Sequence, residues 1–460
     1  MMMAAFTINE ILKATGGDLV RPGAARSCSG VSTDTRSLQE GDLFIPLAGE
    51  NFDGHRFLAA AAAGGASAVL TSRRDAAEIV PEGTAVIFVG NTLTALEELA
   101  RFHRLRFDIP VVAVTGSNGK TTTKDMVSAI LKKKYRVCHT KKNFNNEIGL
   151  SHTLLSLTEE DQVCVTEMGM RGFGQIAELC RTALPSLGIV TNVGTSHIGI
   201  LGSRENIAKA KSELIKALPK DGTAVLNEDD DFVRAMGDSF SGRVISYGVL
   251  RQKDVYAEQI KFRPEGTDFR CVIGEEAEDV HLKLFGIHNV YDALAAAAAG
   301  RFLGVPFSLI KEALEEFTPQ GNSQKLRRIR GALVLDDSYN ANPLSLEMAF
   351  RALLQLPGKR HIIVVGDMLE LGQYAEELHR SMGKKAAELG FDLMISVGGL
   401  GRLMAEEAAA GGMETVCLSS AEDAADYLNG HCGEGDAVLI KASHAMHLDK
   451  IADLWRGEKE

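Results

Sequence analysis

Continuous apolar runs alternate with helix-like stretches in the middle of the chain. The run VVAVTG begins at Val111, and a helical pattern follows it over residues 120–134. The runs RVCHT, QVCVTEMG and LGIVTNVG come next, with helical stretches between them. Buried strands separated by helices are typical of a parallel sheet that is covered on both faces. We therefore predict a mainly parallel α/β domain here.

The same alternation returns after a short break. Residues 221–285 contain the strand patterns TAVLN, RVISYG, FRCVIG and VHLKLFG, which we interpret as an antiparallel addition to the sheet. Helices are predicted over residues 289–301 and 308–317, and PQGNS (319–323) is interpreted as a linker. Five further strands, each followed by a helical stretch, then predict a doubly wound, Rossmann-like domain; they are GALVLDD, HIIVVGD, DLMISVG, ETVCLSS and DAVLIKAS.

The first hundred residues have a mixed pattern. Strands are predicted within GDLFIPLAG (41–49) and GTAVIFVG (83–90), with helices over residues 57–63 and 92–106. Pro110 marks a boundary. A length of 460 residues also suits three domains. The predicted fold class is α/β with a small α/β domain at 1–108, a central domain at 109–318 and a Rossmann-like domain at 319–460.

Composition narrows the class of protein. Hydrophobic residues make up 45 % and charged residues 24 %, as in ordinary globular chains. The net charge of -11, without a basic stripe, argues against nucleic-acid binding. The seven scattered cysteines contain no Cys-x-x-Cys pair, so neither a disulfide framework nor a zinc site is indicated. Because no signal peptide and no 18-residue apolar run occur, we expect a cytoplasmic protein with no membrane partner.

A glycine-rich turn connects the first central strand to its helix. The segment VVAVTGSNGKTTTK (111–124) places a lysine and hydroxyl residues where the helix begins. Backbone N–H groups at such a helix start favour a polyphosphate, here that of ATP. Lys120 is expected to contact the β- and γ-phosphates, and the Thr121 hydroxyl to bind Mg²⁺. The predicted nucleotide-binding residues of this loop are Thr115, Gly116, Ser117, Asn118, Gly119, Lys120, Thr121 and Thr122.

This loop departs from the standard P-loop, whose first glycine would stand at Val114. The shorter form argues against motor-type and switch-type NTPases. The alternative is an ordinary strand–turn–helix with a surface lysine. Glu167 and His197 follow two other central strands, so a parallel sheet would bring them to the same edge as the loop. A pair of metal ligands is one interpretation; a helix cap and a core histidine are the other.

Six motifs occur in an order that resembles a known family. They are TGSNGKTT, TEMGM, NVGTSHIG, GIHNVYDALAAAA, DDSYNANP and VVGDMLELG. From about Ile8 to Trp455 the chain resembles the Mur ligases, the ATP-dependent amide-forming enzymes of bacterial peptidoglycan synthesis. DDSYNANP, GDMLELG and STDTR…GDLFIPLAGENFDGH are typical of one branch, which joins D-alanyl-D-alanine to UDP-N-acetylmuramoyl-tripeptide. The loop alone would mark only the wider superfamily, which includes folylpolyglutamate synthetase.

The resemblance implies a two-step reaction. The tripeptide carboxylate attacks the γ-phosphate of ATP to give an acyl phosphate and ADP, and the dipeptide amine then displaces phosphate. The family's catalytic residues map to Lys120, Glu167, His197 and Lys211. Two Mg²⁺ ions are implied, with Thr121 and Glu167 at the first and His197 at the second. Lys211 matches a lysine that carries a CO₂-derived carbamate and supports the second ion. Neighbouring Lys209 leaves the register open, and a surface lysine is the alternative.

Further nucleotide contacts follow from the same resemblance. His288, Asn289 and Asp292 resemble a His-Asn-x-x-Asn motif on the adenine side, although the last position here is aspartate. Lys325 stands for an arginine that reaches the γ-phosphate, a role that Arg327 or Arg328 could take instead. Asp337 matches an aspartate on the nucleotide side, at the ribose. His444 replaces an arginine of the family motif Lys-Gly-Ser-Arg, and we assign it no catalytic role.

Substrate contacts are implied mainly outside the nucleotide loop. The predicted contacts to the UDP-sugar peptide are Ser32, Thr35, Arg36, Asn51, Asp53, Gly54 and His55 in the first domain and Asn145 and Asn146 in the central domain, with Asn340 and Asn342 near the linker. Each cluster could also be a simple turn. Closure about the linker is expected to bring the last two domains onto ATP.

Two rival interpretations remain. A sibling ligase could use another acceptor, as a glutamate-adding or a folate-type enzyme does. The amino-terminal domain argues against the folate type, which usually lacks one. A nucleotide-binding regulatory module would not turn ATP over, but intact Lys120, Glu167 and His197 argue against it. We expect a monomer. The sequence leaves open whether lysine or meso-diaminopimelate stands third in the peptide.

Overall fold

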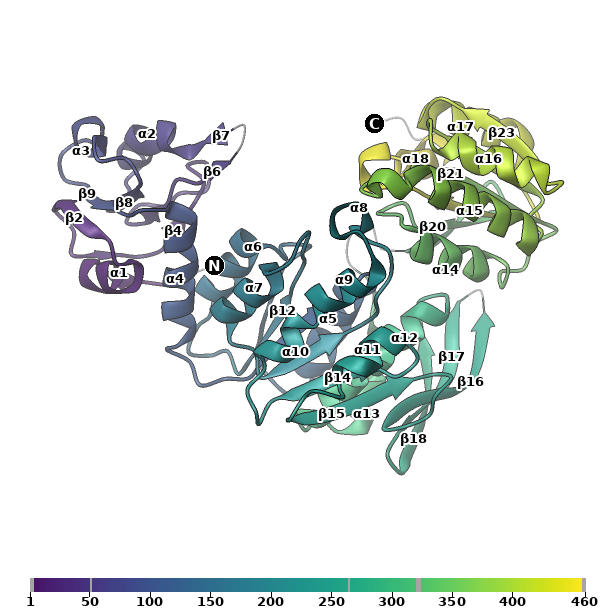
Figure 1. Ribbon diagram of the computed structural model, residues 1–460, viewed down its shortest axis with the longest axis horizontal. Coiled ribbons are helices and arrows are strands. Elements are labelled where there is room, and N and C mark those ends of the chain that lie inside the picture. The colour runs from purple at the N-terminus through teal and green to yellow at the C-terminus, as the bar shows by residue number, and fades with distance from the viewer. Residues whose placement is uncertain (1–3, 50–51, 264, 320–323, 457–460) are drawn as a thin grey trace. The chain divides into compact units, whose positions relative to one another are not determined.

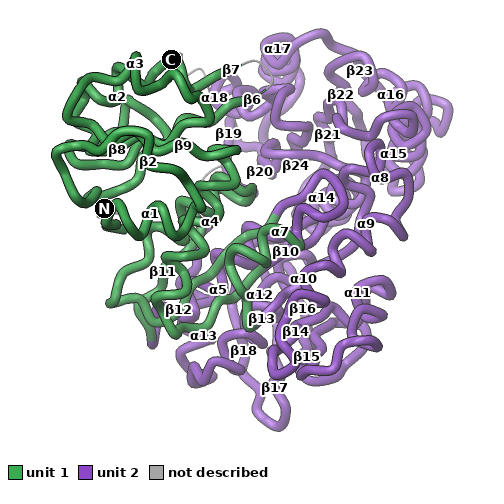
Figure 2. The backbone as a smooth tube through the Cα atoms, turned by 60° about the vertical axis from the view of Figure 1, so that its left-hand side comes forward, with its two compact units in different colours: residues 1–113, 135–168, 177–186 green, residues 114–134, 169–176, 187–460 purple. Residues whose placement is uncertain are grey.

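The computed structural model describes residues 4–49, 52–263, 265–319 and 324–456. The chain is divided into two compact units (Figure 2). Unit 1 contains residues 1–113, 135–168 and 177–186, and unit 2 contains the remainder. The boundary falls within strand β10 (Val111–Thr115). The domain limits at 108/109 and 318/319 stay a prediction.

Unit 1 begins with a small α/β sheet in the order β2-β9-β8-β5-β4. Four strands run parallel and β2 is antiparallel to β9. The sheet strands are β2 (Asp18–Arg21), β4 (Val31–Ser32), β5 (Leu43–Phe44), β8 (Ala68–Thr71) and β9 (Ala85–Phe88). The helices are α1 (Ile8–Thr15), α2 (Leu58–Ala63), α3 (Ala76–Ile79) and α4 (Thr92–Arg104). Phe44, Leu58 and Val86 belong to the hydrophobic core of this small domain.

Short elements complete unit 1. They are β1 (Phe6–Thr7) paired with β3 (Ser27–Cys28), β6 (Ala48–Gly49) paired with β7 (Phe52–Asp53), and the 3₁₀ turn η1 (Gly54–Phe57). The unit also holds β11 (Val137–His139), α6 (Glu147–Leu155), β12 (Val163–Glu167) and most of α7 (Gln175–Ala183). β11 and β12 pair in parallel, as expected for strands that helices separate.

The first part of unit 2 contains a mixed sheet (Figure 1). β13 (Leu187–Val190), β14 (Thr223–Asn227), β15 (Arg243–Gly248) and β16 (Val255–Arg263) run parallel. β17 (Gly266–Ile273) and β18 (Glu276–Leu282) continue it antiparallel. The predicted antiparallel addition is therefore wrong for TAVLN and RVISYG. Every residue of β14 is buried, which suits a parallel strand covered on both faces, whereas β16 is buried only at Val255 and Ala257 and is partly or fully exposed at its other positions.

Helices surround this sheet. They are α5 (Lys120–Lys132), α9 (Arg204–Lys211), α10 (Glu213–Ala217), α11 (Asp231–Met236), α12 (Ile287–Phe302) and α13 (Phe307–Glu316). The short helix α8 (Ile198–Leu201) lies in the loop after β13 and contacts η2 (Gly372–Tyr374) and α9. α12 packs against α5, and every residue from 293 to 299 is buried. The alanine tract therefore forms a closely packed helix interface, because alanine lets two helix backbones approach.

The second part of unit 2 is doubly wound, as predicted. Its sheet has the order β19-β20-β24-β21-β22-β23. The five expected strands, which all run parallel, are β20 (Ala332–Asp336), β21 (Arg360–Gly366), β22 (Leu393–Val397), β23 (Glu414–Leu418) and β24 (Asp436–Lys441). In β21, Ile363 and Val365 join one core cluster while Ile362 and Val364 join another, so both faces are covered. This alternation explains the continuous apolar strand.

Helices flank that sheet on both faces (Figure 1). They are α14 (Pro343–Leu353), α15 (Ala375–Leu389), α16 (Gly401–Ala410), α17 (Ala421–His431) and α18 (Lys450–Arg456), with the 3₁₀ turns η2 (Gly372–Tyr374) and η3 (His444–Met446). The sixth strand, β19 (Lys325–Ile329), was not predicted, and it pairs antiparallel with β20 at the sheet edge. Its sequence KLRRI has no continuous apolar run, because an edge strand keeps polar side chains.

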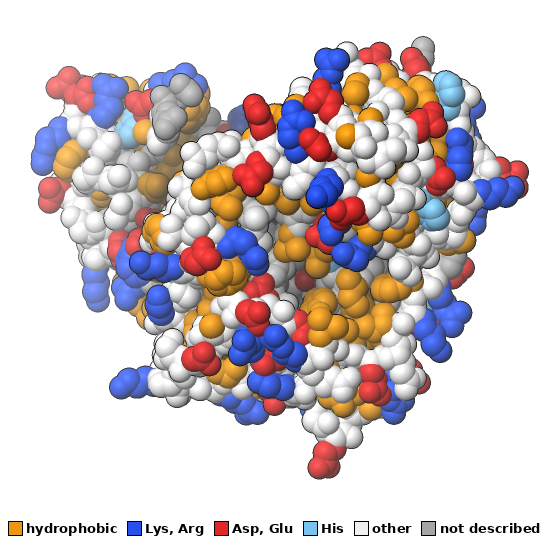
Figure 3. All heavy atoms as spheres, turned by 45° about the vertical axis from the view of Figure 1, so that its right-hand side comes forward, with side chains coloured by type: hydrophobic (Ala, Val, Ile, Leu, Met, Phe, Trp, Pro, Cys, Tyr) orange, Lys and Arg blue, Asp and Glu red, His pale blue; other side chains and the backbone are white. Residues whose placement is uncertain are grey.

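The cysteines, the helix lengths and the surface charges can be compared with the expectations from composition. All seven cysteines are free, and five of them are buried. Among the described residues no helix has the length and apolar character to cross a bilayer. Figure 3 shows acidic and basic side chains interspersed over one face of the molecule.

Candidate active site

The glycine-rich loop lies in unit 2, between buried β10 and α5. A Cβ on Gly116 would stand 1.8 Å from Thr191 Oγ1, so only glycine fits there. Thr191 Oγ1 donates to the Asn118 carbonyl at 2.6 Å, and the Asn118 amide donates to Asn192 Oδ1 at 3.0 Å. Ser117 accepts from the Gly194 amide at 2.8 Å. The segment after β13 therefore holds the loop in its shape, a role that sequence reasoning did not assign to Thr191 and Asn192.

Lys120 lies over the mouth of the loop at the first residue of α5. Its ammonium donates to the carbonyls of Gly116 and Ser117 at 2.8 and 3.2 Å. Gly119, with φ +79°, precedes the helix, and no side chain caps it. The first N–H groups of α5 and a cationic side chain are thus directed to one region. Such an arrangement suits a polyphosphate anion.

Asp292 supports this loop from α12. Its Oδ1 accepts a hydrogen bond from Thr123 Oγ1 at 3.0 Å, and a Cβ on Gly119 would lie 2.3 Å from the same oxygen. Burial raises the pKa of Asp292 to about 8, with the Thr123 bond opposing the shift. The aspartate that departs from the family motif is therefore packed under the phosphate loop. Its predicted adenine contact stays a prediction.

Glu167 ends β12 in unit 1 and is buried. Asn145 Nδ2 donates to its Oε1 at 2.7 Å, and its backbone N–H donates to Thr140 Oγ1 at 3.2 Å. The other oxygen, Oε2, is buried without a hydrogen-bond partner. Neighbouring Asn146 caps α6 by accepting from the Gly149 amide at 3.0 Å. Two predicted residues, Glu167 and Asn145, are therefore joined, and one carboxylate oxygen remains suited to a cation.

His197 and Lys211 both lie in unit 2. His197 stands immediately before α8 with φ +64°, and its Nδ1 is 3.1 Å from Glu370 Oε2. Burial lowers its pKa. Lys211 ends α9 and is only 2 % exposed, so the surface-lysine alternative is wrong. Burial, reinforced by the charge of Lys120, holds the pKa of Lys211 well below its usual value. A lysine of lowered pKa has the neutral amine that CO₂ requires for carbamate formation.

The adenine-side residues are packed around the start of α12. Asn289 is buried and donates to the Phe285 carbonyl at 2.9 Å and to Gln324 Oε1 at 3.1 Å. His288 is also within 3.1 Å of the Asn289 amide, and burial lowers the pKa of His288 to about 4. Gln324, which sequence reasoning missed, thus ties α12 to the start of β19. No motif marked it, because its role depends on the tertiary contact.

Asp337 follows β20 and is held by a buried lysine. Lys441 Nζ donates to Asp337 Oδ2 at 2.7 Å and to the Asn340 carbonyl at 2.8 Å. Lys325 lies in β19, opposite Asp336. Arg327 is within 3.6 Å of Asp336 and 3.2 Å of Asp453, so it is engaged in ion pairs beside that strand. The phosphate role of Lys325 stays a prediction.

Asn342 connects the loop to the Rossmann-like part of unit 2. It caps α14 by accepting from the Ser345 amide at 3.0 Å. Its Nδ2 donates to Asn118 Oδ1 at 2.6 Å and to Ser196 Oγ at 3.0 Å. The turn interpretation of SYNANP and a role beside the nucleotide loop are therefore compatible.

The amino-terminal cluster forms turns in unit 1. Ser32 Oγ donates a hydrogen bond to the Asp34 carbonyl at 2.9 Å, and Arg36 forms a solvent-exposed ion pair with Asp34. The Arg36 bond and charge lower the pKa of Asp34 to about 2. His55 is buried, with Nδ1 2.7 Å from Asp53 Oδ1 and Nε2 3.0 Å from Ser72 Oγ.

The remaining predicted substrate residues of this domain are Gly54, Thr35 and Asn51. Gly54 begins η1 and packs against Leu47, while Thr35 lies in the turn after Asp34. Asn51 lies outside the described residues. The uridine and pyrophosphate roles of this cluster stay predictions.

No group of three or more His, Cys, Asp or Glu side chains in the described ranges could hold a metal by itself. Mg²⁺ commonly takes one or two protein carboxylates and completes its shell with water and phosphate oxygens. The buried, unpartnered Oε2 of Glu167 fits such a sparse site.

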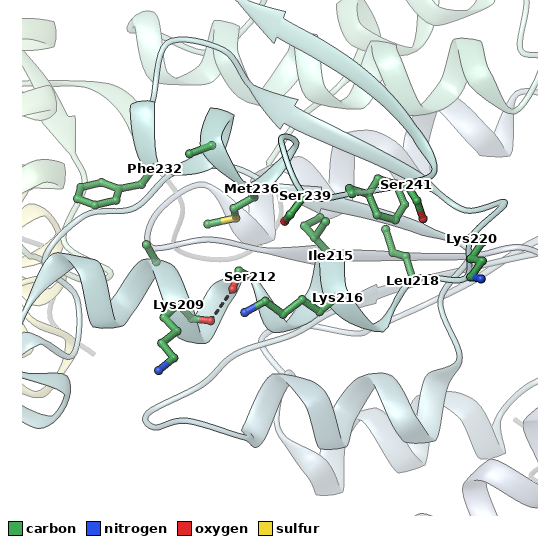
Figure 4. Close-up of a pocket in the computed structure, with 13 residues that line it drawn as sticks. Lys209, Ser212, Ile215, Lys216, Leu218, Lys220, Phe232, Met236, Ser239 and Ser241 are labelled. Carbon is green, nitrogen blue, oxygen red and sulfur yellow. Dashed lines mark hydrogen bonds between the residues drawn. The ribbon is translucent and has the colours of Figure 1, made fainter.

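A cavity of about 570 Å³ lies at α9, α10 and α11 (Figure 4). Lys209, Lys216 and Lys220 line it with exposed side chains, and Ser212 Oγ donates to the Lys209 carbonyl at 2.7 Å. Apolar side chains such as Phe232 and Met236 complete its wall. Apart from Lys209, the alternative to Lys211 in the carbamate register, no predicted site residue lines this cavity, which is therefore separate from the phosphate loop.

Comparison with known families identifies the class of protein. The Mur ligase middle domain matches residues 114–300, the Mur ligase glutamate ligase domain residues 323–444, and the Mur ligase family catalytic domain residues 27–104. The chain belongs to the Mur ligase family.

Individual relatives narrow the class. The UDP-N-acetylmuramoyl-tripeptide–D-alanyl-D-alanine ligase of Bacillus subtilis (strain 168) is 38 % identical, over 97 % of each chain. The enzyme of that name from Escherichia coli (strain K12) is 37 % identical over 86 % of each chain. A crystal structure of MurF from Acinetobacter baumannii superposes with a TM-score of 0.91 and 30 % identity, covering 99 % of this chain and 100 % of that one.

A second solved structure bears on the nucleotide. MurF ligase from Thermotoga maritima in complex with ADP is 27 % identical, with a TM-score of 0.84 and coverage of 96 % of this chain and 98 % of that one. Within the family, the chain is similar to the MurF branch over nearly its whole length. The predicted family, three-domain α/β fold class and ATP binding are confirmed.

Proposed function

We propose that this chain joins D-alanyl-D-alanine to UDP-N-acetylmuramoyl-tripeptide and couples the reaction to cleavage of ATP to ADP and phosphate. The product is the UDP-linked pentapeptide used for peptidoglycan. The observation that carries the proposal is the loop at residues 115–122, with Lys120 over its mouth, in a chain that matches ligases of this name from end to end. Such a loop binds ATP, and the matched branch defines the acceptor.

The chemistry divides into two displacements. A carboxylate oxygen of the tripeptide attacks Pγ, the bond from Pγ to the bridging oxygen breaks, and ADP leaves. The dipeptide amine then attacks the acyl carbon, the C–O bond to phosphate breaks, and the amine loses a proton. The first step brings two anions together, so it requires positive charge at Pγ. Lys120 and the N–H groups at the start of α5 supply that charge.

Mg²⁺ supplies further neutralisation of the phosphate oxygens when it is bound. Thr121 and Glu167 are proposed for a first ion and His197 for a second. The support for Glu167 is its buried Oε2, which lacks a hydrogen-bond partner. Asn145 holds the other oxygen of that carboxylate at 2.7 Å, which would fix its orientation.

Lys211 is proposed to carry a carbamate. Its burial and lowered pKa favour the neutral amine, the form that adds to CO₂. The carbamate would replace a neutral amine with an anion near His197, and so support the second ion. An uncharged or cationic lysine could not do so.

The substrates are small molecules, and we assign the UDP-sugar to the amino-terminal residues and the muramoyl-peptide end to Asn145 and Asn146. The nucleotide contacts outside the loop are assigned to Asn289, Asp292, Lys325 and Asp337, with Asn340 and Asn342 beside them. ATP and UDP-linked precursors are intracellular metabolites, so we place the reaction in the cytoplasm. A monomer is sufficient, because one chain carries every proposed contact.

The decisive test measures phosphate release from ATP and Mg²⁺ with UDP-N-acetylmuramoyl-tripeptide, with and without D-alanyl-D-alanine, together with product mass. We expect release that depends on the dipeptide and a product with the mass of the pentapeptide. ATP binding without release, for both the lysine and the meso-diaminopimelate tripeptide, would contradict the proposal. It would then favour a sibling acceptor or a regulatory module.

A further inference from the structure

Two loops of unit 2 that lie far apart in the sequence meet at α8. In Figures 1 and 2, α8 lies beside the segment that leads into α15, and α8 contacts η2 directly. A Cβ on Gly199 would lie 2.6 Å from the Gly372 amide nitrogen, so the two backbones touch. Tyr374 also donates from its hydroxyl to the Gly202 carbonyl at 2.8 Å. The loop after β21 is thereby docked on the loop that carries His197.

One acidic side chain crosses this contact. Glu370 Oε2 lies 3.1 Å from His197 Nδ1, and Glu370 Oε1 lies 3.6 Å from Arg171 Nη2. Glu370 and His197 both adopt left-handed backbone conformations, with φ +62° and +64°. Such conformations are unusual for residues other than glycine and persist where the surroundings require them. The two side chains are therefore directed at each other by their loops.

The chemistry of the pair fixes which histidine nitrogen is available. An ionised carboxylate can only accept a hydrogen bond, so Nδ1 must carry the hydrogen that faces Glu370. A neutral imidazole then has its lone pair on Nε2, the atom that can bind a cation. His197 Nδ1 has no hydrogen-bond partner in this structure, although Glu370 Oε2 is 3.1 Å away. Because the Glu370 side chain is 49 % exposed, a small rotation can align it.

We propose that Glu370 is a positioning residue, which orients His197 by accepting from Nδ1–H so that Nε2 faces the phosphate site. The inference rests on the proposed function. Glu370 belongs to the loop after β21, whereas His197 belongs to the loop after β13. Docking of the Rossmann-like part on α8 therefore completes the His197 site. Carboxylates that hold metal-binding histidines in this way commonly change metal affinity 10- to 100-fold when removed.

The test compares variants at Glu370 by electron paramagnetic resonance of bound Mn²⁺, with a non-hydrolysable ATP analogue and the UDP-tripeptide. We expect Glu370→Ala to raise the apparent Kd of the weaker Mn²⁺ ion about 10- to 100-fold. Glu370→Gln keeps an acceptor oxygen and should recover most of the affinity. Glu376→Ala, an exposed glutamate at the start of α15, is the matched control and should match the unmodified protein.

Tyr374→Phe separates positioning from docking. It removes the bond to the Gly202 carbonyl and leaves the carboxylate in place, so its Mn²⁺ affinity should change less than that of Glu370→Ala. Equal losses in the two variants, or an unchanged Kd in Glu370→Ala, would overturn the proposal. Thermal denaturation of each variant excludes loss of folding. If the unmodified protein makes no pentapeptide in the phosphate-release assay, the proposed function fails; if it does and Glu370→Ala still binds Mn²⁺ normally, only the positioning role fails.

Discussion

Asp292 illustrates how a single buried side chain supports the phosphate loop from a neighbouring helix. It is buried on α12, accepts from Thr123 and packs against Gly119. Desolvation raises its pKa to about 8, from an ordinary value of 3.8. Between these values the folded protein holds a proton that the unfolded chain has lost. Stability attributable to this group is therefore complete below about pH 4 and declines as the pH rises to about 8.

Replacing Asp292 with asparagine should remove this decline. The amide oxygen can still accept from Thr123, and no carboxylate has to be desolvated. Relative to the unmodified protein, we expect Asp292→Asn to gain little at pH 4 and on the order of a few kcal/mol at pH 8. Urea unfolding at several pH values measures the difference. Parallel stability curves would contradict the expectation, and Asp238→Asn, an exposed aspartate after α11, serves as the control.

Lys211 is the second residue whose environment predicts a chemical state. Because it is buried with a lowered pKa, exposure of the protein to ¹³C-bicarbonate should produce a carbamate signal in ¹³C NMR. Lys211→Met should abolish that signal and lower kcat at least about tenfold, by loss of a group that supports a metal ion. Lys209→Met should retain both, because Lys209 is exposed. A signal that survives in Lys211→Met and disappears in Lys209→Met would reverse the register.

At the scale of elements, the phosphate loop between β10 and α5 keeps its shape through hydrogen bonds to the segment after β13. Thr191 and Asn192 hold Asn118, and Ser117 in turn holds Gly194. The strand–turn–helix pattern was evident from the sequence. Its partner segment was not, because the bonds join residues more than 70 positions apart.

Gly116→Ala should deform this arrangement. The added methyl would overlap Thr191 Oγ1, and overpacking typically costs about 1–3 kcal/mol. If the loop bears that cost, ADP affinity should fall about 5- to 150-fold. Isothermal titration with ADP measures the loss. Gly172→Ala, where a methyl meets nothing within 4 Å, is the matched control and should bind ADP normally. Equal ADP affinities in the two variants would contradict the prediction, because the loop would then accommodate the methyl group without cost.

At the scale of the whole molecule, unit 2 contains both the phosphate loop and the Rossmann-like sheet. The linker predicted at residues 319–323 lies between them, and residues 320–323 are outside the described ranges. Since the proposed nucleotide contacts come from both sides of the linker, productive binding is expected to require closure.

Small-angle scattering tests this closure. The radius of gyration should decrease when a non-hydrolysable ATP analogue and UDP-N-acetylmuramoyl-tripeptide are added together. Either ligand alone should have a smaller effect, because each engages fewer of the proposed contacts. Identical profiles in all conditions would count against closure, and dilution series exclude a change of oligomeric state.

The sequence by itself determined the features that depend on local pattern. Continuous apolar runs separated by helices specify parallel strands covered on both faces, so the doubly wound sheet from β20 to β24 was predictable. The glycines, lysine and hydroxyls after Val114 were predictable for the same reason, because their spacing alone builds an anion-binding turn. The motif order gave the family.

Only the tertiary structure decided what depends on contacts between distant segments. β19 was missed because an edge strand lacks an apolar run, and β14 and β15 were given the wrong direction because short strands do not encode their partners. Three features of the site also depend on such contacts: the burial of Lys211, the packing of Asp292 against Gly119 and the approach of Glu370 to His197. Desolvation and side-chain direction arise from packing, so neither could be obtained from residue type and spacing.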